Sequence, residues 1–233
     1  MKKNALIFGY NEYARQIASQ IASEYERVHI FILDETLRHQ AESDGFRVSI
    51  FDLSDEWSEI EQEYHIENTV AFCTLEDDAH NIFLTISLRA EFSHMYIVAL
   101  AKDTEGINKL KIAGANRILP IVQITANLIS EILEKPVVTN VLHNILYEDS
   151  DIKISQITVA EGDSVVGRNS HALSLKEMYN LILLAIVDGK LDTNFVFTAK
   201  GFNHTISVGD VLVVIGLQED IDRFNQEIKR SRG

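Results

Sequence analysis

The segment from residue 4 to 14, Asn-Ala-Leu-Ile-Phe-Gly-Tyr-Asn-Glu-Tyr-Ala, has the frame of a phosphate-binding loop between a strand and a helix. In the motif Gly-x-Gly-x-x-Gly, the first glycine makes the turn, the second lets backbone approach a pyrophosphate, and the third lets helix and strand pack closely. Those three places hold Gly9, Asn11 and Ala14. Gly9 and the small Ala14 preserve the turn and the packing, whereas Asn11 weakens the approach to phosphate.

Polar side chains follow the next three predicted strands where each strand ends. Asp34 comes roughly 20 residues beyond the loop, where a dinucleotide-binding fold places an acid on ribose hydroxyls. Asp52 follows strand three and is placed to line the same crevice near an adenine. Helix capping or solvation in a loop is the alternative for both residues. The candidate ligand-contacting residues are Gly9, Tyr10, Asn11, Glu12, Tyr13, Asp34, Asp52, Thr74 and Glu76.

The sequence offers no catalytic or metal-binding pattern. Its eight histidines are scattered without metal-ligand spacing, and no local signature indicates a nucleophile with its base. Glu76, Asp77 and Asp78 begin a predicted helix, where the backbone dipole favours carboxylates. Cys73 is the single cysteine and lies in an apolar strand, so we expect it to be buried in a protein of a reducing compartment. We therefore predict neither a catalytic residue nor a metal site.

The composition is that of a soluble globular protein. The chain has 233 residues, of which 46% are hydrophobic and 24% are charged. Lys and Arg number 21 against 35 Asp and Glu, a net charge of -14 that disfavours nucleic acid and anionic lipid as partners. The longest apolar run, Leu181 to Val187, is strand-sized. Because Met-Lys-Lys runs directly into the first strand, we expect no signal peptide.

The elements that must position these residues alternate between strand and helix up to about residue 119. Arg15–Glu24 has helical spacing of its apolar residues. The alternation predicts an α/β fold, a Rossmann-like doubly wound parallel sheet with its ligand site at the carboxyl ends of the strands. The six expected strands are Ala5–Gly9, Val28–Leu33, Phe46–Phe51, Asn68–Thr74, Met95–Ala101 and Asn116–Leu119.

The pattern changes after Pro120. Ile121–Leu133 and Val137–Leu146 are apolar helical stretches hinged at Lys135-Pro136, because proline and the residue before it disfavour a continuous helix. Such a pair either packs on its own sheet or crosses to a partner subunit. A small α+β lobe follows, with strands at Ile154–Val159, Leu181–Val187, Phe195–Thr198 and Val211–Ile215 and a helix at Gln218–Lys229. The predicted divisions are residues 1–120, 121–148 and 149–233.

Along nearly its whole length the chain resembles RCK domains (regulators of potassium conductance) of the TrkA-N plus TrkA-C type. These are cytosolic modules of prokaryotic potassium channels and Trk/Ktr-type potassium uptake systems. The matching segments are Leu6-Ile-Phe-Gly-Tyr10, Asp34, Phe51-Asp52, Thr74-Leu-Glu-Asp-Asp-Ala-His-Asn81, Ala113-Gly-Ala-Asn-Arg-Ile-Leu-Pro120, Ser164-Val-Val-Gly167 and Val208-Gly-Asp-Val-Leu-Val-Val-Ile-Gly216.

The resemblance implies a non-enzymatic regulatory domain in the cytoplasm, held at the inner face of the cell membrane by a channel or transporter. Its partners would be itself, as a homodimer or an octameric ring, and a potassium channel pore or a transporter membrane subunit. Residues 121–146 would form a helical crossover that embraces the second subunit. A ligand in the cleft would change the angle of the dimer and so act on the pore. The chain would be a free-standing subunit or the cytosolic part of a longer channel.

Departures from the family pattern bear on the ligand. Asn11 and Ala14 replace glycines, and Glu12 stands where nucleotide-binding relatives often have Arg, so its carboxylate would repel phosphate. Strand five ends at Lys102, where calcium-gated relatives place acidic residues. NAD(H), an adenine nucleotide such as AMP, and a cleft without nucleotide remain as alternatives. The competing function is an NAD-dependent oxidoreductase, for which the C-terminal lobe offers no acid or base.

Overall fold

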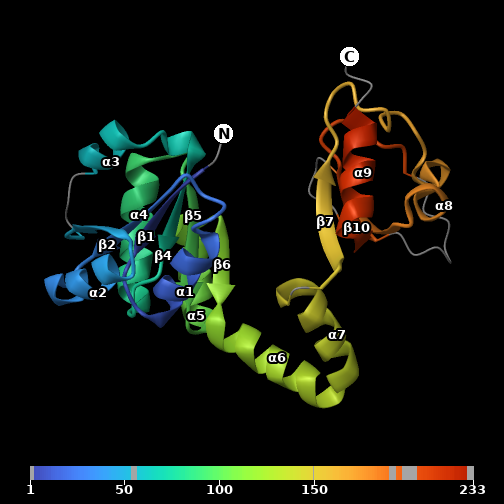
Figure 1. The fold of residues 1–233 in the computed structure, drawn as a ribbon. Coiled ribbons are helices and arrows are strands. Elements are labelled where there is room, and N and C mark those ends of the chain that lie inside the picture. Colours follow the sequence, from blue (N-terminus) through green and yellow to red (C-terminus); the bar gives the residue numbers. More distant parts are fainter. Residues whose placement is uncertain (1–2, 54–56, 149, 189–192, 196–203, 230–233) are drawn as a thin grey trace. The chain divides into compact units, whose positions relative to one another are not determined.

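The computed structural model describes residues 3–53, 57–148, 150–188, 193–195 and 204–229. The chain divides into two compact units, residues 1–130 and 131–233. In Figure 1 the first unit runs from blue to green and the second from yellow-green to red. Each unit has its own hydrophobic core.

A parallel six-stranded sheet forms the centre of the first unit, with the strand order β3-β2-β1-β4-β5-β6. The strands are β1 (Asn4–Phe8), β2 (Arg27–Ile32), β3 (Arg47–Ile50), β4 (Thr69–Cys73), β5 (Tyr96–Ala101) and β6 (Arg117–Pro120). All six predicted strands are confirmed, as is the Rossmann-like doubly wound topology. The order reverses between β1 and β4, which makes their carboxyl ends the switch point where such sheets bind ligands.

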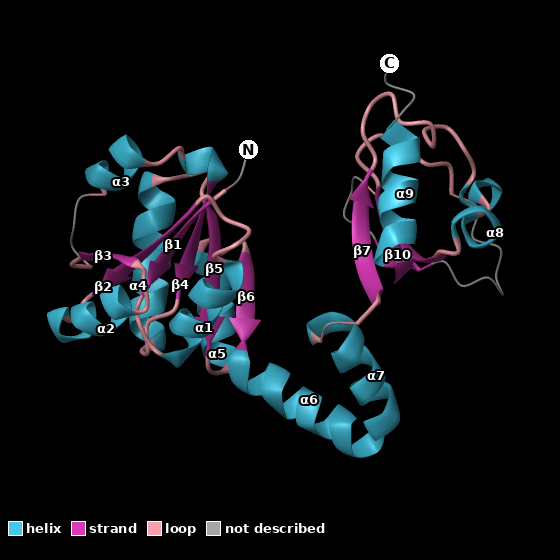
Figure 2. Cartoon of the chain, viewed as in Figure 1, coloured by secondary structure: helices cyan, strands magenta, loops and turns pink. Residues whose placement is uncertain are grey.

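Helices cover both faces of this sheet (Figure 2). They are α1 (Glu12–Ile21), α2 (Arg38–Ser43), α3 (Ser58–Glu63), α4 (Asp78–Glu91) and α5 (Thr104–Ala113). Alternate residues of β1 point to opposite faces, as a strand requires. Leu6 and Phe8 pack in the core with residues of α3, α4 and α5, whereas Ile7 packs with residues of α1 and α2. This double burial explains why β1 reads as one continuous apolar run.

The second unit contains a four-stranded antiparallel sheet with the order β7-β10-β8-β9. Its elements are β7 (Ile152–Thr158), α8 (Leu175–Tyr179), β8 (Ile182–Val187), β9 (Thr193–Phe195), β10 (Val211–Leu217) and α9 (Gln218–Lys229). Ile221, Phe224 and Ile228 of α9 are buried in its core. The predicted α+β lobe is confirmed. Of the strand expected at Phe195–Thr198, only Phe195 lies within the described residues.

Two apolar helices, α6 (Ile121–Glu134) and α7 (Pro136–Tyr147), connect the sheets in sequence. Lys135 separates them with non-helical dihedral angles (φ -135, ψ 58), and Pro136 is the first residue of α7. The predicted helices and their hinge are confirmed. Both helices carry large apolar side chains that are exposed: Val122, Ile124, Leu128, Ile129, Ile132, Leu133, Val137, Val138, Val141, Leu142, Leu146 and Tyr147. Within the described parts of the chain, no helix is long and apolar enough to cross a membrane.

Candidate ligand-binding site

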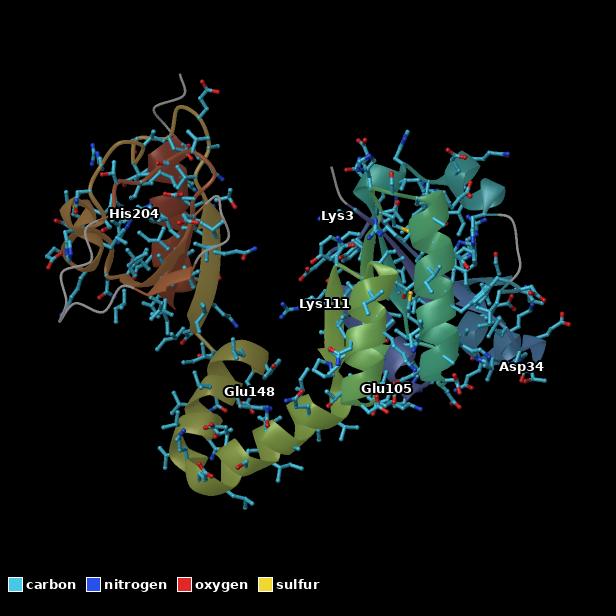
Figure 3. The ribbon with its side chains drawn as sticks, turned by 180° about the vertical axis from the view of Figure 1, so that it is seen from behind. Lys3, Asp34, Glu105, Lys111, Glu148 and His204 are labelled. Atoms are coloured by element: carbon cyan, nitrogen blue, oxygen red, sulfur yellow. The ribbon has the colours of Figure 1, made fainter. Side chains whose placement is uncertain are left out.

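The candidate residues gather where the parallel strands end. Figure 3 shows Asp34, which follows β2, and Glu105, which follows β5, at this end of the first unit, and Lys3, which precedes β1, at the opposite end. The loops after β1 and β4 meet at the switch point between these strands. Gly9 has φ +107, a conformation that favours glycine. A Cβ there would lie 3.0 Å from the carbonyl oxygen of Thr74, so this glycine lets the two loops approach.

Asn11 links the two loops and caps α1. Its Oδ1 accepts from the backbone N–H of Ala14 at 3.0 Å, and its Nδ2 donates to the carbonyl oxygen of Thr74 at 2.7 Å. The helix begins at Glu12 and ends at Ile21, so the prediction of Arg15–Glu24 was wrong at both boundaries. The physical reason at the start is the cap, because asparagine is among the preferred residues at that position.

The loop after β4 is held by buried polar groups. The Thr74 hydroxyl donates to the carbonyl oxygen of Phe8 at 2.9 Å. The Asn81 amide forms two hydrogen bonds with the backbone of Leu75, accepting from its N–H at 2.8 Å and donating to its carbonyl oxygen at 2.9 Å. Thr74 and Asn81 are each 1% exposed. These contacts fix the position of Glu76, which follows in the chain and is exposed.

Several carboxylates near the strand ends accept hydrogen bonds from backbone N–H groups. Asp34 accepts from the backbone N–H of Thr36 at 2.9 Å, and this bond and one with the Thr36 side chain lower the pKa of Asp34 below its usual value. Asp77 caps α4, and its bonds from the N–H groups of His80 and Ala79 lower its pKa likewise. Asp78 accepts from the backbone N–H of Lys102 at 3.0 Å. The capping interpretation of Asp34 is therefore confirmed, and it leaves the carboxylate exposed beside the cleft.

Glu12 is accessible to a ligand, whereas Tyr10 is largely buried. Glu12 is exposed in the first turn of α1, and bonds from Gln16 and Arg15 lower the pKa of its carboxyl. Tyr10 is 7% exposed and packs in the core beneath α1. Its hydroxyl donates to Asp44 at 2.5 Å, and burial together with this bond raises the pKa of the phenol above its usual value.

Two hollows lie at the switch point and share Asn11, Leu75 and Glu76. The first hollow, of about 480 Å³, faces β2 and is lined by Gly9, Tyr10, Asn11, Leu33, Asp34, Leu37, Leu75, Glu76, Asp77 and His80. The second, of about 340 Å³, faces β5 and is lined by Asn11, Glu12, Tyr13, Leu75, Glu76, Asp78, Asn81, Leu100, Lys102, Ile121 and Val122. Seven of the nine candidate residues thus line a hollow; Asp52 and Thr74 are not among the lining residues.

Sequence reasoning missed several lining residues. Lys102 follows β5 directly, so the same rule that selected Asp34 after β2 could have selected it. Ile121 and Val122 carry no such signal, because the apolar start of α6 reads only as a packing surface. No three His, Cys, Asp or Glu side chains among the described residues are arranged to hold a metal ion.

Comparison with known proteins identifies the family. A TrkA-N domain matches residues 5–120 and a TrkA-C domain matches residues 154–229. The chain therefore belongs to the RCK family, in which a TrkA-N domain is followed by a TrkA-C domain.

The relatives include two proteins of Methanocaldococcus jannaschii. The chain is 23% identical over 242 residues to "Probable potassium channel protein 2", an alignment that covers 100% of this chain and 68% of that protein. It is 24% identical over 238 residues to "Potassium channel protein 1", covering 98% of this chain and 68% of that protein. Homology to potassium channel proteins supports a regulatory role for this chain.

Solved structures share the fold. The human SLO3 gating ring matches with a TM-score of 0.64 and 12% identity, over 95% of this chain and 46% of that chain. The GsuK RCK domain matches with a TM-score of 0.50 and 19% identity, over 97% of this chain and 46% of that chain. The chain thus spans less than half of either structure's chain. At these identities the likeness establishes the fold alone.

Proposed function

We propose that this chain is a ligand-sensing regulatory domain that controls potassium transport through a membrane channel or transporter. Its membership of the RCK family and its homology to two potassium channel proteins support this function. The observation that carries the ligand-sensing part is the pair of hollows at the β1/β4 switch point. The domain acts from the cytoplasmic side of the membrane, where it binds a channel pore or a transporter membrane subunit.

The ligand contains an adenosine moiety, with NAD(H) and adenine nucleotides as the candidates. Asp34 stands where dinucleotide-binding folds hold ribose hydroxyls, and its carboxyl group, whose pKa the bonds from Thr36 lower further, is charged at neutral pH. A charged carboxylate accepts two ribose O–H groups more strongly than a neutral one would. Gly9 and Leu33 line the same hollow of about 480 Å³ beside Asp34.

Regulation works through subunit geometry. Helices α6 and α7 each carry exposed apolar residues that a monomer would leave in water, and a second copy of the chain would cover them. We divide the chain accordingly into a Rossmann-like lobe (1–120), a dimerising crossover (121–148) and a C-terminal lobe (149–233). Ile121 and Val122, at the start of α6, line the second hollow. A ligand that favours one dimer geometry shifts the population toward it by its differential affinity.

The direct test is calorimetry of the purified protein with a panel of NAD⁺, NADH, AMP, ADP, ATP and adenosine. Asp34→Ala should lower the affinity for the adenosine ligand by about tenfold, which corresponds to the loss of a hydrogen bond to a charged group. Glu35→Ala, the neighbouring exposed carboxylate, is the matched control. If Asp34→Ala binds the ligand with unchanged affinity, the assignment of this hollow to a nucleotide is wrong. Steady turnover of NAD(H) with any substrate would instead favour the oxidoreductase alternative.

A further inference from the structure

The two hollows at the switch point share Asn11, Leu75 and Glu76 in their linings. Asn11 belongs to both linings, and its Nδ2 donates to the Thr74 carbonyl oxygen across the gap between the β1 and β4 loops. In a dinucleotide-binding fold the pyrophosphate lies at this point, against the N–H groups at the start of the first helix. Here the N–H of Ala14 already donates to Asn11 Oδ1. The helix start therefore offers a phosphate one donor fewer.

Glu76 places a negative charge at the same point. Its exposed side chain is shared by both hollows, beside Asn11 and Leu75. Asp77 caps α4 next to it, and Glu12 lies on the other side in the second hollow. Among the residues that line the two hollows, Lys102 is the one with a lysine or arginine side chain. It lies in the second hollow, whereas Asp34 lies in the first. A phosphate chain extending from a ribose at Asp34 would therefore pass carboxylates before it met a cation.

We propose that the hollow beside Asp34 selects a nucleoside or a nucleoside monophosphate, and that the Asn11–Thr74 bridge and Glu76 reject di- and triphosphates and dinucleotides. This specificity rests on the proposed ligand-sensing function and narrows its ligand class. The bridge acts by blocking the path of a pyrophosphate, and Glu76 acts by repelling its charge. Because Glu76 is exposed to water, its repulsion amounts to a several-fold effect for each added phosphate charge.

The test compares affinities within one ligand series. Adenosine, AMP, ADP, ATP and NAD⁺ are titrated calorimetrically into the purified chain at fixed ionic strength, with EDTA present because Mg²⁺ would neutralise the phosphates. We expect adenosine and AMP to bind at least tenfold more tightly than ATP or NAD⁺. Glu76→Gln removes the charge with little change of shape. It should raise the affinity for ADP and ATP several-fold and leave the affinity for adenosine unchanged.

Two further variants separate the parts of the proposal. Asn11→Gly removes the bridge. It should raise the affinity for NAD⁺ more than that for the other ligands, because NAD⁺ must span both hollows. Glu105→Gln is the matched control: it removes a carboxylate at the same end of the sheet (Figure 3), one that pairs with Lys109 outside the two linings. It should leave the ranking of the ligands unchanged. If Asn11→Gly fails to fold, Glu76→Gln still tests the charge term, since its side chain is exposed.

Two contrary results have different meanings. If ATP or NAD⁺ binds more tightly than adenosine, and Glu76→Gln does not change the ranking, the specificity is overturned while ligand sensing stands. If no member of the series binds, the adenosine assignment of the proposed function falls together with the specificity that depends on it.

Discussion

At the scale of single residues, His29 shows how burial sets a protonation state. It is 2% exposed, with its Nδ1 2.8 Å from the Tyr64 hydroxyl and its Nε2 2.9 Å from the Ser49 hydroxyl. Burial is the main cause that lowers the pKa of His29 from 6.5 to about 4; the nearby Arg47 and Arg27 contribute to this decrease, and Glu63 opposes it. The ring is therefore neutral at physiological pH and acts as a hydrogen-bonding part of the core.

This pKa predicts how stability depends on pH. Between pH 6.5 and 4 the unfolded chain binds a proton at His29 that the folded protein does not, so the free energy of unfolding falls as the pH falls through this window. The full contribution is up to about 3 kcal/mol. His29→Gln keeps polar contacts but cannot titrate, so its stability should fall less over the same range. Urea unfolding followed by Trp57 fluorescence measures both proteins, and parallel curves would contradict the prediction.

Residue types alone revealed part of the site. Gly9 was predictable because a turn with positive φ needs glycine, and Asp34 because it ends a strand at the carboxyl edge. The roles of Asn11 were not predictable, since a motif that expects glycine at that place gives no information about a side chain. Its cap and its bridge depend on the Ala14 N–H and the Thr74 carbonyl group, and only the folded backbone brings these together.

At the scale of elements, Arg89 fastens the end of α4 to the end of α5. Its Nε and Nη2 donate to the Gly114 carbonyl oxygen at 3.1 and 3.0 Å. Its Nη1 donates to the Ser93 carbonyl oxygen at 2.6 Å. Its Nη2 also donates to Asn116 Oδ1 at 2.6 Å. Asn116 Oδ1 accepts as well from the backbone N–H of Ile97 in β5. One guanidinium thus satisfies carbonyl groups at two helix ends that would otherwise need water.

We expect Arg89→Lys to destabilise the first unit by about 2 kcal/mol, because an ammonium group cannot reproduce the forked donors of the guanidinium. Arg38→Lys is the matched control: Arg38 forms an exposed pair with Glu42 one helical turn away, and such pairs contribute little. Denaturant unfolding measures both variants. Equal stability of Arg89→Lys and the wild-type protein would show that the donors to Gly114 and Asn116 contribute nothing.

Elements were predicted better than their ends. The strands were found because β1, β4 and β5 are almost entirely apolar, as parallel strands covered on both faces usually are. The start of α1 was missed because its cap lies inside the loop motif. The hydrogen bonds from Arg89 to Gly114 and Asn116 were invisible in the sequence, because their partners lie 25 and 27 positions further along the chain and only the folded helices bring them together.

At the scale of the whole molecule, the apolar residues of α6 and α7 require an explanation that the single chain does not supply. Leu133 is 78% exposed and Val137 is 74% exposed, on either side of the Lys135 hinge. Fully burying such a side chain contributes about 1.5–3 kcal/mol. Exposed apolar surfaces of this extent mark interaction sites in soluble proteins. A second copy of the chain would bury the same residues twice, as a two-fold interface does.

We therefore predict that the protein is at least a dimer at micromolar concentration and that charges on the apolar faces dissociate it. Leu128→Glu in α6 and Val141→Glu in α7 should each shift the mass measured by light scattering toward the monomer, since a carboxylate cannot be buried there without a partner. Asn127→Glu and Asn140→Glu are the matched controls. Each adds the same charge one residue away, on the polar face of its helix, and should leave the mass unchanged. A wild-type monomer, or dissociation by the controls as well, would exclude these apolar faces as the dimer interface.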